Sequence, residues 1–204
     1  MDDDKIEPNV NSLKIWRFDE LASTNDAAKS ALKGERFQRC ATPFPCVFVA
    51  ERQSAGRGTN GRVWASWRGA LTFSIAARWS DFNLTRRECP VLSIRVADAI
   101  AETTREITRR ANVDLGTRLF VKEPNDVYCD GRKLSGVLIE SPNPQDVVIG
   151  VGVNIFNRST DAPNELRSSV VSLVEILQEE RAEKYEELRR FFLSLCLAKI
   201  LKRP

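Results

Sequence analysis

The chain has 204 residues, of which 42% are hydrophobic and 29% are charged, a composition typical of a globular domain with a sizeable core. Its net charge of +3 is too small to indicate nucleic-acid binding. No histidine is present, which excludes a Ser-His-Asp triad, a Cys-His pair and a metal site with histidine ligands. The five cysteines are scattered without a C-x-x-C pair, which favours reduced thiols in a cytoplasmic protein over disulfides or a zinc site.

The sequence carries no membrane or export signal. No apolar run approaches the roughly 18 residues of a membrane-spanning helix, so no membrane attachment is expected. The acidic start, MDDDK, lacks the apolar segment of a signal peptide. We therefore expect residues 1–12 to be a disordered or foreign N-terminus, and residues 13–204 to form a single domain that ends in helices.

A first polar cluster, STND at residues 23–26, follows an alternating stretch at residues 13–18 that predicts a strand. Ser23 and Asp26 have the spacing of a capping box, and Gly34 is suited to end the helix that would follow. The cluster therefore either only begins a helix or also offers hydrogen bonds to a polar ligand at the helix N-terminus.

A loop rich in glycine and arginine, residues 51–64, follows a second predicted strand at residues 46–50. Gly56, Gly58 and Gly61 form G-x-G-x-x-G, but the next residues do not start the helix that a dinucleotide site requires. The chain has no D-F-G motif, which excludes a protein kinase. The flexible backbone and the arginines favour close contact with an anion, the alternative being a loop whose arginines are solvated.

The segment at residues 121–140 has the pattern strand, turn, strand, and Asp130-Gly131 between two apolar runs is a strong hairpin signal. Two amines, an amide and a carboxylate near one end of this hairpin predict a site for an anionic substrate, unless they are ordinary charges of a solvated turn. These four residues are Lys122, Lys133, Asn125 and Asp126.

The other predicted strands are at residues 70–79 and 147–155, and the later helices at 87–110, 170–177 and 182–201. Gly150 and Gly152 interrupt the apolar strand at 147–155, and glycine inside a strand often marks the close approach of a ligand. Asn154 is polar in an apolar setting and requires a partner. The alternative for this strand is a bulge with an amide at the sheet edge.

Four segments, in this order and spacing, resemble the catalytic domain of biotin protein ligases. Each motif is weak alone, but the four together are specific, and the similarity extends over residues 13–156. The segments are residues 23–25 (the family's STN), 51–58 with 61–64 (its glycine- and arginine-rich loop), 122–126 with 133–136 (its KWPND and KLxG) and 150–154 (its GxGxN).

This resemblance implies an α+β fold, a mixed β-sheet backed by helices like the core of class II aminoacyl-tRNA synthetases. It also implies that biotin and MgATP give biotinyl-5'-AMP and pyrophosphate, and that biotin then passes to a lysine of a biotin carboxyl carrier protein. ATP and Mg²⁺ are the implied cofactors, although no protein ligand for Mg²⁺ stands out. We expect neither an N-terminal DNA-binding domain nor the small C-terminal β-barrel of many members, hence no DNA as partner, while a homodimer is compatible with the family.

The resemblance also assigns site residues. Lys122 is expected to meet the biotin carboxylate and the α-phosphate and to neutralise charge there, with Arg57 as a second catalytic group. The residues expected to bind biotin are Ser23, Thr24, Asn25, Gln53, Gly56, Arg57, Lys122 and Gly150, and those expected to bind the nucleotide are Arg57, Gly58, Arg62, Trp64, Asn125, Lys133 and Asn154.

Departures from the family pattern leave two other functions open. Glu123 stands where the family has tryptophan, and Thr59 and Asn60 replace arginines, so a catalytically weak biotin or nucleotide binder is one alternative. A lipoyl or octanoyl ligase of the same superfamily is the other, although the loop around Gln53 favours biotin over a linear acyl chain. Because neighbours in an extended segment point to opposite faces, an inward Lys122 predicts an exposed Glu123.

Overall fold

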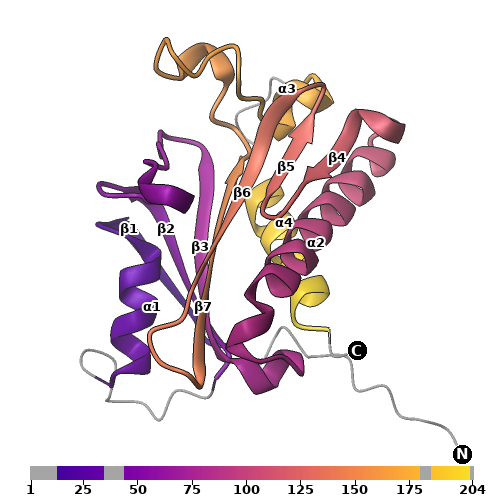
Figure 1. The fold of residues 1–204 in the computed structure, drawn as a ribbon. Coiled ribbons are helices and arrows are strands. Elements are labelled where there is room, and N and C mark those ends of the chain that lie inside the picture. The colour runs from indigo at the N-terminus through magenta and orange to yellow at the C-terminus, as the bar shows by residue number, and fades with distance from the viewer. Residues whose placement is uncertain (1–12, 35–43, 180–184, 203–204) are drawn as a thin grey trace, which may run out of the picture.

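The computed structural model describes residues 13–34, 44–179 and 185–202, and these form one mixed sheet with four α-helices (Figure 1). The seven strands lie in the order β1-β2-β3-β7-β6-β5-β4. Only β1 and β2 pair in parallel, and every other neighbouring pair is antiparallel. The predicted α+β fold with a mixed sheet is thus confirmed. The strands are β1 (Ile15–Leu21), β2 (Cys46–Gln53), β3 (Ala70–Arg78), β4 (Leu119–Lys122), β5 (Asp126–Cys129), β6 (Arg132–Glu140) and β7 (Asp146–Asn154).

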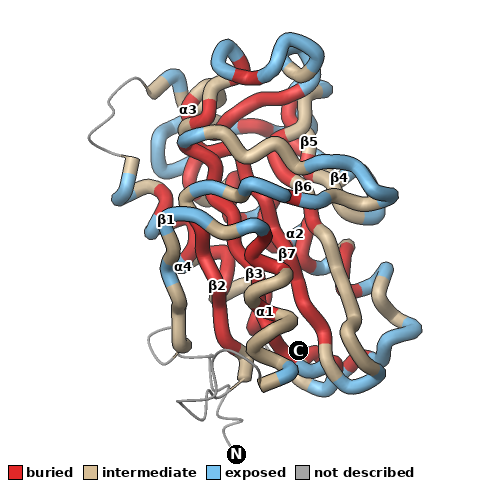
Figure 2. Tube along the Cα trace, turned by 90° about the vertical axis from the view of Figure 1, so that its left-hand side faces the viewer, coloured by how far each residue is buried: buried red, intermediate tan, exposed pale blue. Residues whose placement is uncertain are grey.

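Helices cover both faces of the sheet. The helices are α1 (Thr24–Leu32), α2 (Cys89–Arg110), α3 (Leu173–Leu177) and α4 (Tyr185–Ile200). On one face α2 and α4 pack together, and their apolar side chains join those of the strands in the main core, while α1 packs with β2, β3 and β7 on the other face. Figure 2 shows the resulting burial along β2, β3 and β7, three neighbouring inner strands of the sheet.

The predicted helix at 87–110 is found as α2. Leu92, Val96 and Ile100 recur every four residues and are almost completely buried against the sheet, the spacing of an amphipathic helix. Thr85 and Glu88 form a capping box just before it, so the chain at residues 86–88 is a 3₁₀ turn rather than the first α-helical turn.

The start of α1 differs from the prediction. Ser23 is the extended N-cap residue, but its side chain makes no capping hydrogen bond. The capping box fails because Asp26 binds Arg57 and Lys29 instead of the backbone. The predicted end of the helix is correct, since Gly34 has a φ of 72° and its N–H donates to the carbonyl of Ala31.

The predicted hairpin is present, but it is the second of two. Asp130 and Gly131 both have positive φ, 50° and 73°, as a two-residue hairpin turn between β5 and β6 requires. A preceding turn at residues 123–125 separates the edge strand β4 from β5, whereas the sequence pattern predicts one extended run.

The first of the two predicted C-terminal helices is shorter than predicted. Of the segment at 170–177 only α3 is helical, beginning after a capping box formed by Ser172 and Glu175. Of the segment at 182–201, α4 covers Tyr185–Ile200, and residues 182–184 lie outside the described part of the chain. Within the described ranges no helix is both long and apolar enough to cross a bilayer.

Candidate functional site

A cavity of about 230 Å³ lies on the α1 face of the sheet, beyond the N-terminus of α1. Its walls come from that N-terminus, the glycine- and arginine-rich loop, strands β6 and β7, and the segment at residues 166–170. All of the predicted site residues line it except Gly56 and Lys122. Sequence motifs that lie as much as 130 residues apart, from Thr24 to Asn154, therefore meet at one cavity.

One wall of the cavity is a buried chain of polar side chains. The backbone N–H of Thr24 donates to Gln53 Oε1 at 2.7 Å, and Thr24 Oγ1 lies 3.0 Å from the same oxygen. Ser74 Oγ lies 2.7 Å from Thr24 Oγ1 and 2.5 Å from Asn25 Oδ1. Thr24, Asn25 and Ser74 are at most 4% exposed. The hydrogen bonds among these three side chains are thus shielded from water, so which group donates in each of them matters.

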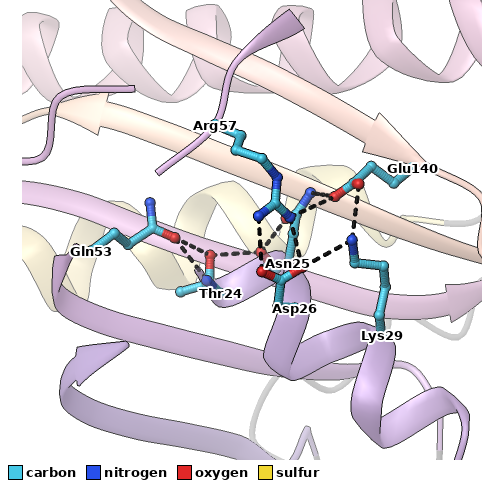
Figure 3. Close-up of polar contacts among 8 residues, drawn as sticks. Thr24, Asn25, Asp26, Lys29, Gln53, Arg57 and Glu140 are labelled. Carbon is cyan, nitrogen blue, oxygen red and sulfur yellow. Dashed lines mark hydrogen bonds and ion pairs between the residues drawn. The ribbon is translucent and has the colours of Figure 1, made fainter. Parts of the chain in front are cut away.

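A charged cluster continues from this wall, as Figure 3 shows. Asn25 Nδ2 donates to Glu140 Oε2 at 2.6 Å, and Lys29 Nζ donates to Glu140 Oε1 at 3.0 Å. Arg57 donates to both oxygens of Asp26, at 2.8 and 2.6 Å, and its Nη2 lies 3.6 Å from Glu140. Lys29 also pairs with Asp26, at 2.9 Å. Two carboxylates and two cations therefore balance one another at this side of the cavity.

The cluster sets the ionisation of its carboxyl groups. The hydrogen bond from Arg57 lowers the pKa of Asp26 from 3.8 to about 2. Burial acts to raise the pKa of Glu140, but the hydrogen bonds from Asn25 and Lys29 outweigh it, and the pKa is lowered. The side chain of Glu140 is 28% exposed, so this carboxylate is a half-buried anion with three partners.

The two glycines of β7 make room for the protein's own side chains. A Cβ at Gly150 would overlap the carboxamide of Asn25, and a Cβ at Gly152 would overlap the indole of Trp64. The sequence predicts close approach at this strand, but the approaching groups in the structure are these two cavity walls. Gly56 has a similar role, because a Cβ there would overlap the carbonyl of Trp64, and it shapes the loop without lining the cavity.

Lys133 is the lysine that enters the cavity. A register shift leaves Leu134 without a partner between Ser135, which faces Val127, and Lys133, which faces Tyr128. Leu134 therefore points into the core, and Lys133 is turned to the cavity side, where its side chain lies across Gly136. Its Nζ pairs with Asp126 at 2.8 Å.

The backbone of Lys133 is also fixed. Its N–H donates to the carbonyl of Ser169 at 2.8 Å, and its carbonyl accepts from Val171 N–H at 3.0 Å and from Asn154 Nδ2 at 3.2 Å. Asn154 Oδ1 in turn accepts from Asn157 at 2.7 Å. Asn154 lines the cavity, but these bonds occupy its oxygen and one N–H, so it chiefly holds the strand that carries Lys133.

Lys122, which the sequence predicts to carry the chemistry, lies outside the lining of the cavity. It lies at the end of the edge strand β4, exposed, with its Nζ 5.1 Å from the ring centre of Tyr128, and it does not line the cavity. Its edge position puts it one strand outside the lining, next to Asp126 and Tyr128 of β5, which do line the cavity. Glu123 is exposed, as expected, and no ion pair joins it to Lys122 within the described residues.

The cavity favours an anionic ligand. Its described lining includes three cations, Arg57, Arg62 and Lys133, and a single carboxylate, Asp126. No group of three or more His, Cys, Asp or Glu residues that could hold a metal occurs among the described residues. A Mg²⁺ ion here would fit only the mode in which ligand phosphates and one or two carboxylates share the coordination.

The cysteines do not supply a nucleophile in the described part of the chain. Burial raises the pKa of Cys46 and of Cys129 to about 11 and that of Cys196 to about 12, and the pKa of Cys89 is raised for the same reason. These thiols stay protonated at neutral pH and are inert. Cys40 lies outside the described residues.

Three residues of the site were not predicted from the sequence: Ser74, Lys29 and Glu140. Ser74 lies in a buried strand, where a small polar residue carries no sequence signal. Glu140 was detectable, since it follows Gly136 and Leu138 at the period-two spacing of one strand face, and both of these line the cavity.

The fold and cavity define the catalytic-domain architecture found in solved biotin protein ligases. The structure of the Aquifex aeolicus ligase in complex with biotin and ATP matches with a TM-score of 0.66 and 26% identity, over 91% of this chain and 70% of that one. The Leishmania major ligase with biotinyl-5-AMP matches with a TM-score of 0.70 and 22% identity, over 92% of this chain and 73% of that one.

The chain belongs to the biotin/lipoate A/B protein ligase family, whose model matches residues 20–154. It is similar to the bifunctional ligase/repressor BirA of Bacillus subtilis, 29% identical over 82% of this chain and 48% of that protein. It is 34% identical to the biotin–[acetyl-CoA-carboxylase] ligase of Mycobacterium tuberculosis, over 64% of this chain and 45% of that protein. The chain thus spans about half the length of these relatives.

Proposed function

We propose that this protein activates biotin with ATP to biotinyl-5'-AMP and transfers the biotin to a lysine of a biotin carboxyl carrier protein. The observation that carries the proposal is a single cavity with a polar wall at Thr24 and Gln53 and a cationic side at Arg57, Arg62 and Lys133. Biotin requires both parts of this cavity. Its ureido ring pairs with donors and acceptors, and its carboxylate must be brought to a phosphate.

The polar wall would bind the ureido ring. Thr24 supplies a hydroxyl and Gln53 a side-chain amide, and Ser23 adds a second hydroxyl on the cavity lining. Gly150, with no side chain, leaves a flat floor beside them for the fused rings. Asn25 is part of the wall, but its bonds to Ser74 and Glu140 commit most of its hydrogen-bonding capacity.

The cationic side would carry the first chemical step. A carboxylate oxygen of biotin attacks the α-phosphorus of ATP, the new oxygen–phosphorus bond forms, and the bond to pyrophosphate breaks. Negative charge builds up on the phosphoryl oxygens, and Lys133, fixed through its backbone, is placed to stabilise it. Arg62 and Arg57 would hold phosphates, Arg57 after release from Asp26.

The remaining groups have supporting roles. Trp64, seated on Gly152, offers a flat ring on which the adenine can stack, beside Asn125 and Asn154. Mg²⁺ would be held mainly by the phosphates, with Asp126 as the carboxylate within the cavity, and would neutralise phosphate charge. In the second step the carrier lysine attacks the acyl carbon and AMP leaves, so no covalent enzyme intermediate is needed. Reduced thiols agree with a cytoplasmic location.

Two alternatives are less well supported. The exposure of Glu123 removes one reason to expect a catalytically weak binder, although Thr59 still replaces an arginine in the loop. A lipoate ligase shares the fold, since the putative lipoate protein ligase of T. acidophilum with bound lipoic acid matches with a TM-score of 0.56. A lipoyl chain has no ureido group, however, and would leave the buried polar wall at Thr24 and Gln53 unpaired.

The direct test is a titration with biotin, with and without MgATP, while pyrophosphate release is recorded. We expect biotin to bind and pyrophosphate to appear only when biotin and MgATP are both present. Lipoate in place of biotin is the control. Release that depends on lipoate and not on biotin would transfer the assignment to the lipoyl branch, and binding without any release would support the weak binder.

A further inference from the structure

We propose that Glu140, which does not line the cavity, is a positioning residue that fixes the hydrogen-bond polarity of the biotin-binding wall through Asn25 and Ser74. The inference rests on the proposed function, because the ligand is taken to be biotin. It goes beyond that function in naming which polar group the wall accepts from and which residue decides it.

The carboxylate of Glu140 sets the orientation of the neighbouring amide of Asn25. Glu140 lies between Lys29 Nζ, at 3.0 Å, and Arg57 Nη2, at 3.6 Å, so it is ionised and can only accept hydrogen bonds. The amide of Asn25, 2.6 Å away, must therefore turn its Nδ2 group toward Glu140. Its Oδ1 is left facing Ser74.

The orientation of Asn25 in turn determines which group Ser74 donates to. Asn25 Oδ1 has no hydrogen, so the 2.5 Å contact requires Ser74 to donate its single hydrogen to it. Ser74 then has none for Thr24, so the 2.7 Å contact between their hydroxyls takes the hydrogen of Thr24, for which Gln53 Oε1, at 3.0 Å, is the other acceptor in the wall. Ser74 is fully buried, so no water can relax this order.

The last group in this series of hydrogen bonds is the hydroxyl of Thr24, which faces the ligand. The shorter of the two contacts draws the hydrogen of Thr24 to Ser74, and Gln53 Oε1 keeps the backbone N–H of Thr24 as its donor. Thr24 Oγ1 can then only accept from a ligand in the cavity. Gln53 Oε1, which accepts the backbone N–H of Thr24 at 2.7 Å, leaves Nε2 as the amide's donor. The wall is thus set to accept from a ureido N–H at Thr24 and to donate from Gln53 to a ligand oxygen, and the charge of Glu140 maintains this setting.

The prediction is about selectivity, which a loss of stability does not change. Two carbamate analogues of biotin, each with one ring N–H replaced by oxygen, present an acceptor where biotin presents a donor. The wild-type protein should bind one of them at least roughly 100-fold more weakly than biotin, because the oxygen would face the lone pairs of Thr24. Calorimetric titration of biotin and both analogues gives this ratio directly.

Two variants test the chain of bonds. In Glu140→Gln the new amide can also donate, so Asn25 and Ser74 can reverse. Ser74 then donates to Thr24, which frees the hydrogen of Thr24 for the analogue, with Gln53 Oε1 as the competing acceptor. The ratio should fall by at least about tenfold, a difference of roughly 1.4 kcal/mol. Ser74→Ala removes the middle of the chain and should lower the ratio in the same way. Thermal melting of each variant checks that it folds.

Glu106→Gln is the matched control. Glu106 also has two cationic partners, Arg110 at 2.7 Å and Lys199 at 3.1 Å, and its side chain is 31% exposed against 28% for Glu140, but it lies on α2 outside the cavity. In Glu106→Gln the ratio of the affinities for biotin and the analogue should equal that of the wild type. A wild-type ratio in Glu140→Gln or in Ser74→Ala, or an equal fall in Glu106→Gln, overturns the inference alone. Failure of the wild-type protein to bind biotin overturns the proposed function as well.

Discussion

The assignment of Lys133 can be tested by comparing two lysine-to-alanine variants. Lys133→Ala removes the ammonium that enters the cavity, and we expect adenylate formation to be lost. Lys122→Ala removes an exposed ammonium that contacts only the ring of Tyr128 among its described neighbours, and we expect adenylate formation close to that of the wild type.

The structure sets the size of both effects. Loss of one preorganised group that stabilises developing charge costs about 2.7–4 kcal/mol in the barrier, which slows the reaction by about 10²–10³. Lys133→Ala also leaves Asp126, whose side chain is 14% exposed, without its ion-pair partner, at a cost of about 1–3 kcal/mol in the free energy of unfolding. Lys122→Ala loses an exposed cation–π contact worth about 0.5–1 kcal/mol.

A double variant separates folding from catalysis. Lys133→Ala combined with Asp126→Asn removes the unpaired charge, so it should recover most of the lost stability in a denaturant titration while remaining inactive. Pyrophosphate release at saturating biotin and MgATP is the assay. The reasoning is refuted if Lys122→Ala loses activity while Lys133→Ala keeps it, or if the double variant regains both stability and activity.

Three further predictions concern other parts of the site. Gly152→Ala should displace the indole of Trp64 and raise the KM for ATP more than that for biotin, and an unchanged KM for ATP would contradict the seating of Trp64 on this glycine. Because Arg57 lowers the folded-state pKa of Asp26 from 3.8 to about 2, the contribution of Asp26 to stability is complete above pH 4 and is lost as the pH falls toward 2. The difference in unfolding free energy between the wild type and Asp26→Asn should follow this course. A difference that is flat from pH 5 to pH 2 would argue against the Asp26–Arg57 pair. Trypsin cleavage at Arg62 should slow when biotin and MgATP are added together, because the loop then holds phosphate, and equal cleavage rates would count against the loop as a lid.

Much of the fold was accessible from the sequence because it depends on local rules. The period-two and period-3.6 patterns located the central strands and α2, and Asp130-Gly131 located a turn whose positive φ angles only a few residue types accept. The edge strand β4 was not separated from its neighbour, because four residues are too few to show a period.

The site was predicted less completely, for reasons of register. Strict alternation along β6 from Gly136 would point residue 134 into the cavity, and the register shift at Tyr128 turns Lys133 there instead. A one-residue irregularity of this kind leaves no trace in hydrophobicity. The motif resemblance therefore located segments that meet at one cavity, whereas which of Lys122 and Lys133 lines that cavity depends on the register and needed coordinates.

The glycines of β7 have a consequence for the size of ligand that the site admits. Gly150 and Gly152 seat Asn25 and Trp64, and two residues of a strand span about 6.6 Å. The ring-binding wall and the stacking surface therefore rest on two positions of one strand within a hydrogen-bonded sheet, and a side chain at either position would push one of them away. The length of ligand that engages both surfaces therefore depends on this strand as well as on the loop that carries Trp64, and a substitution at Gly150 or Gly152 would change it.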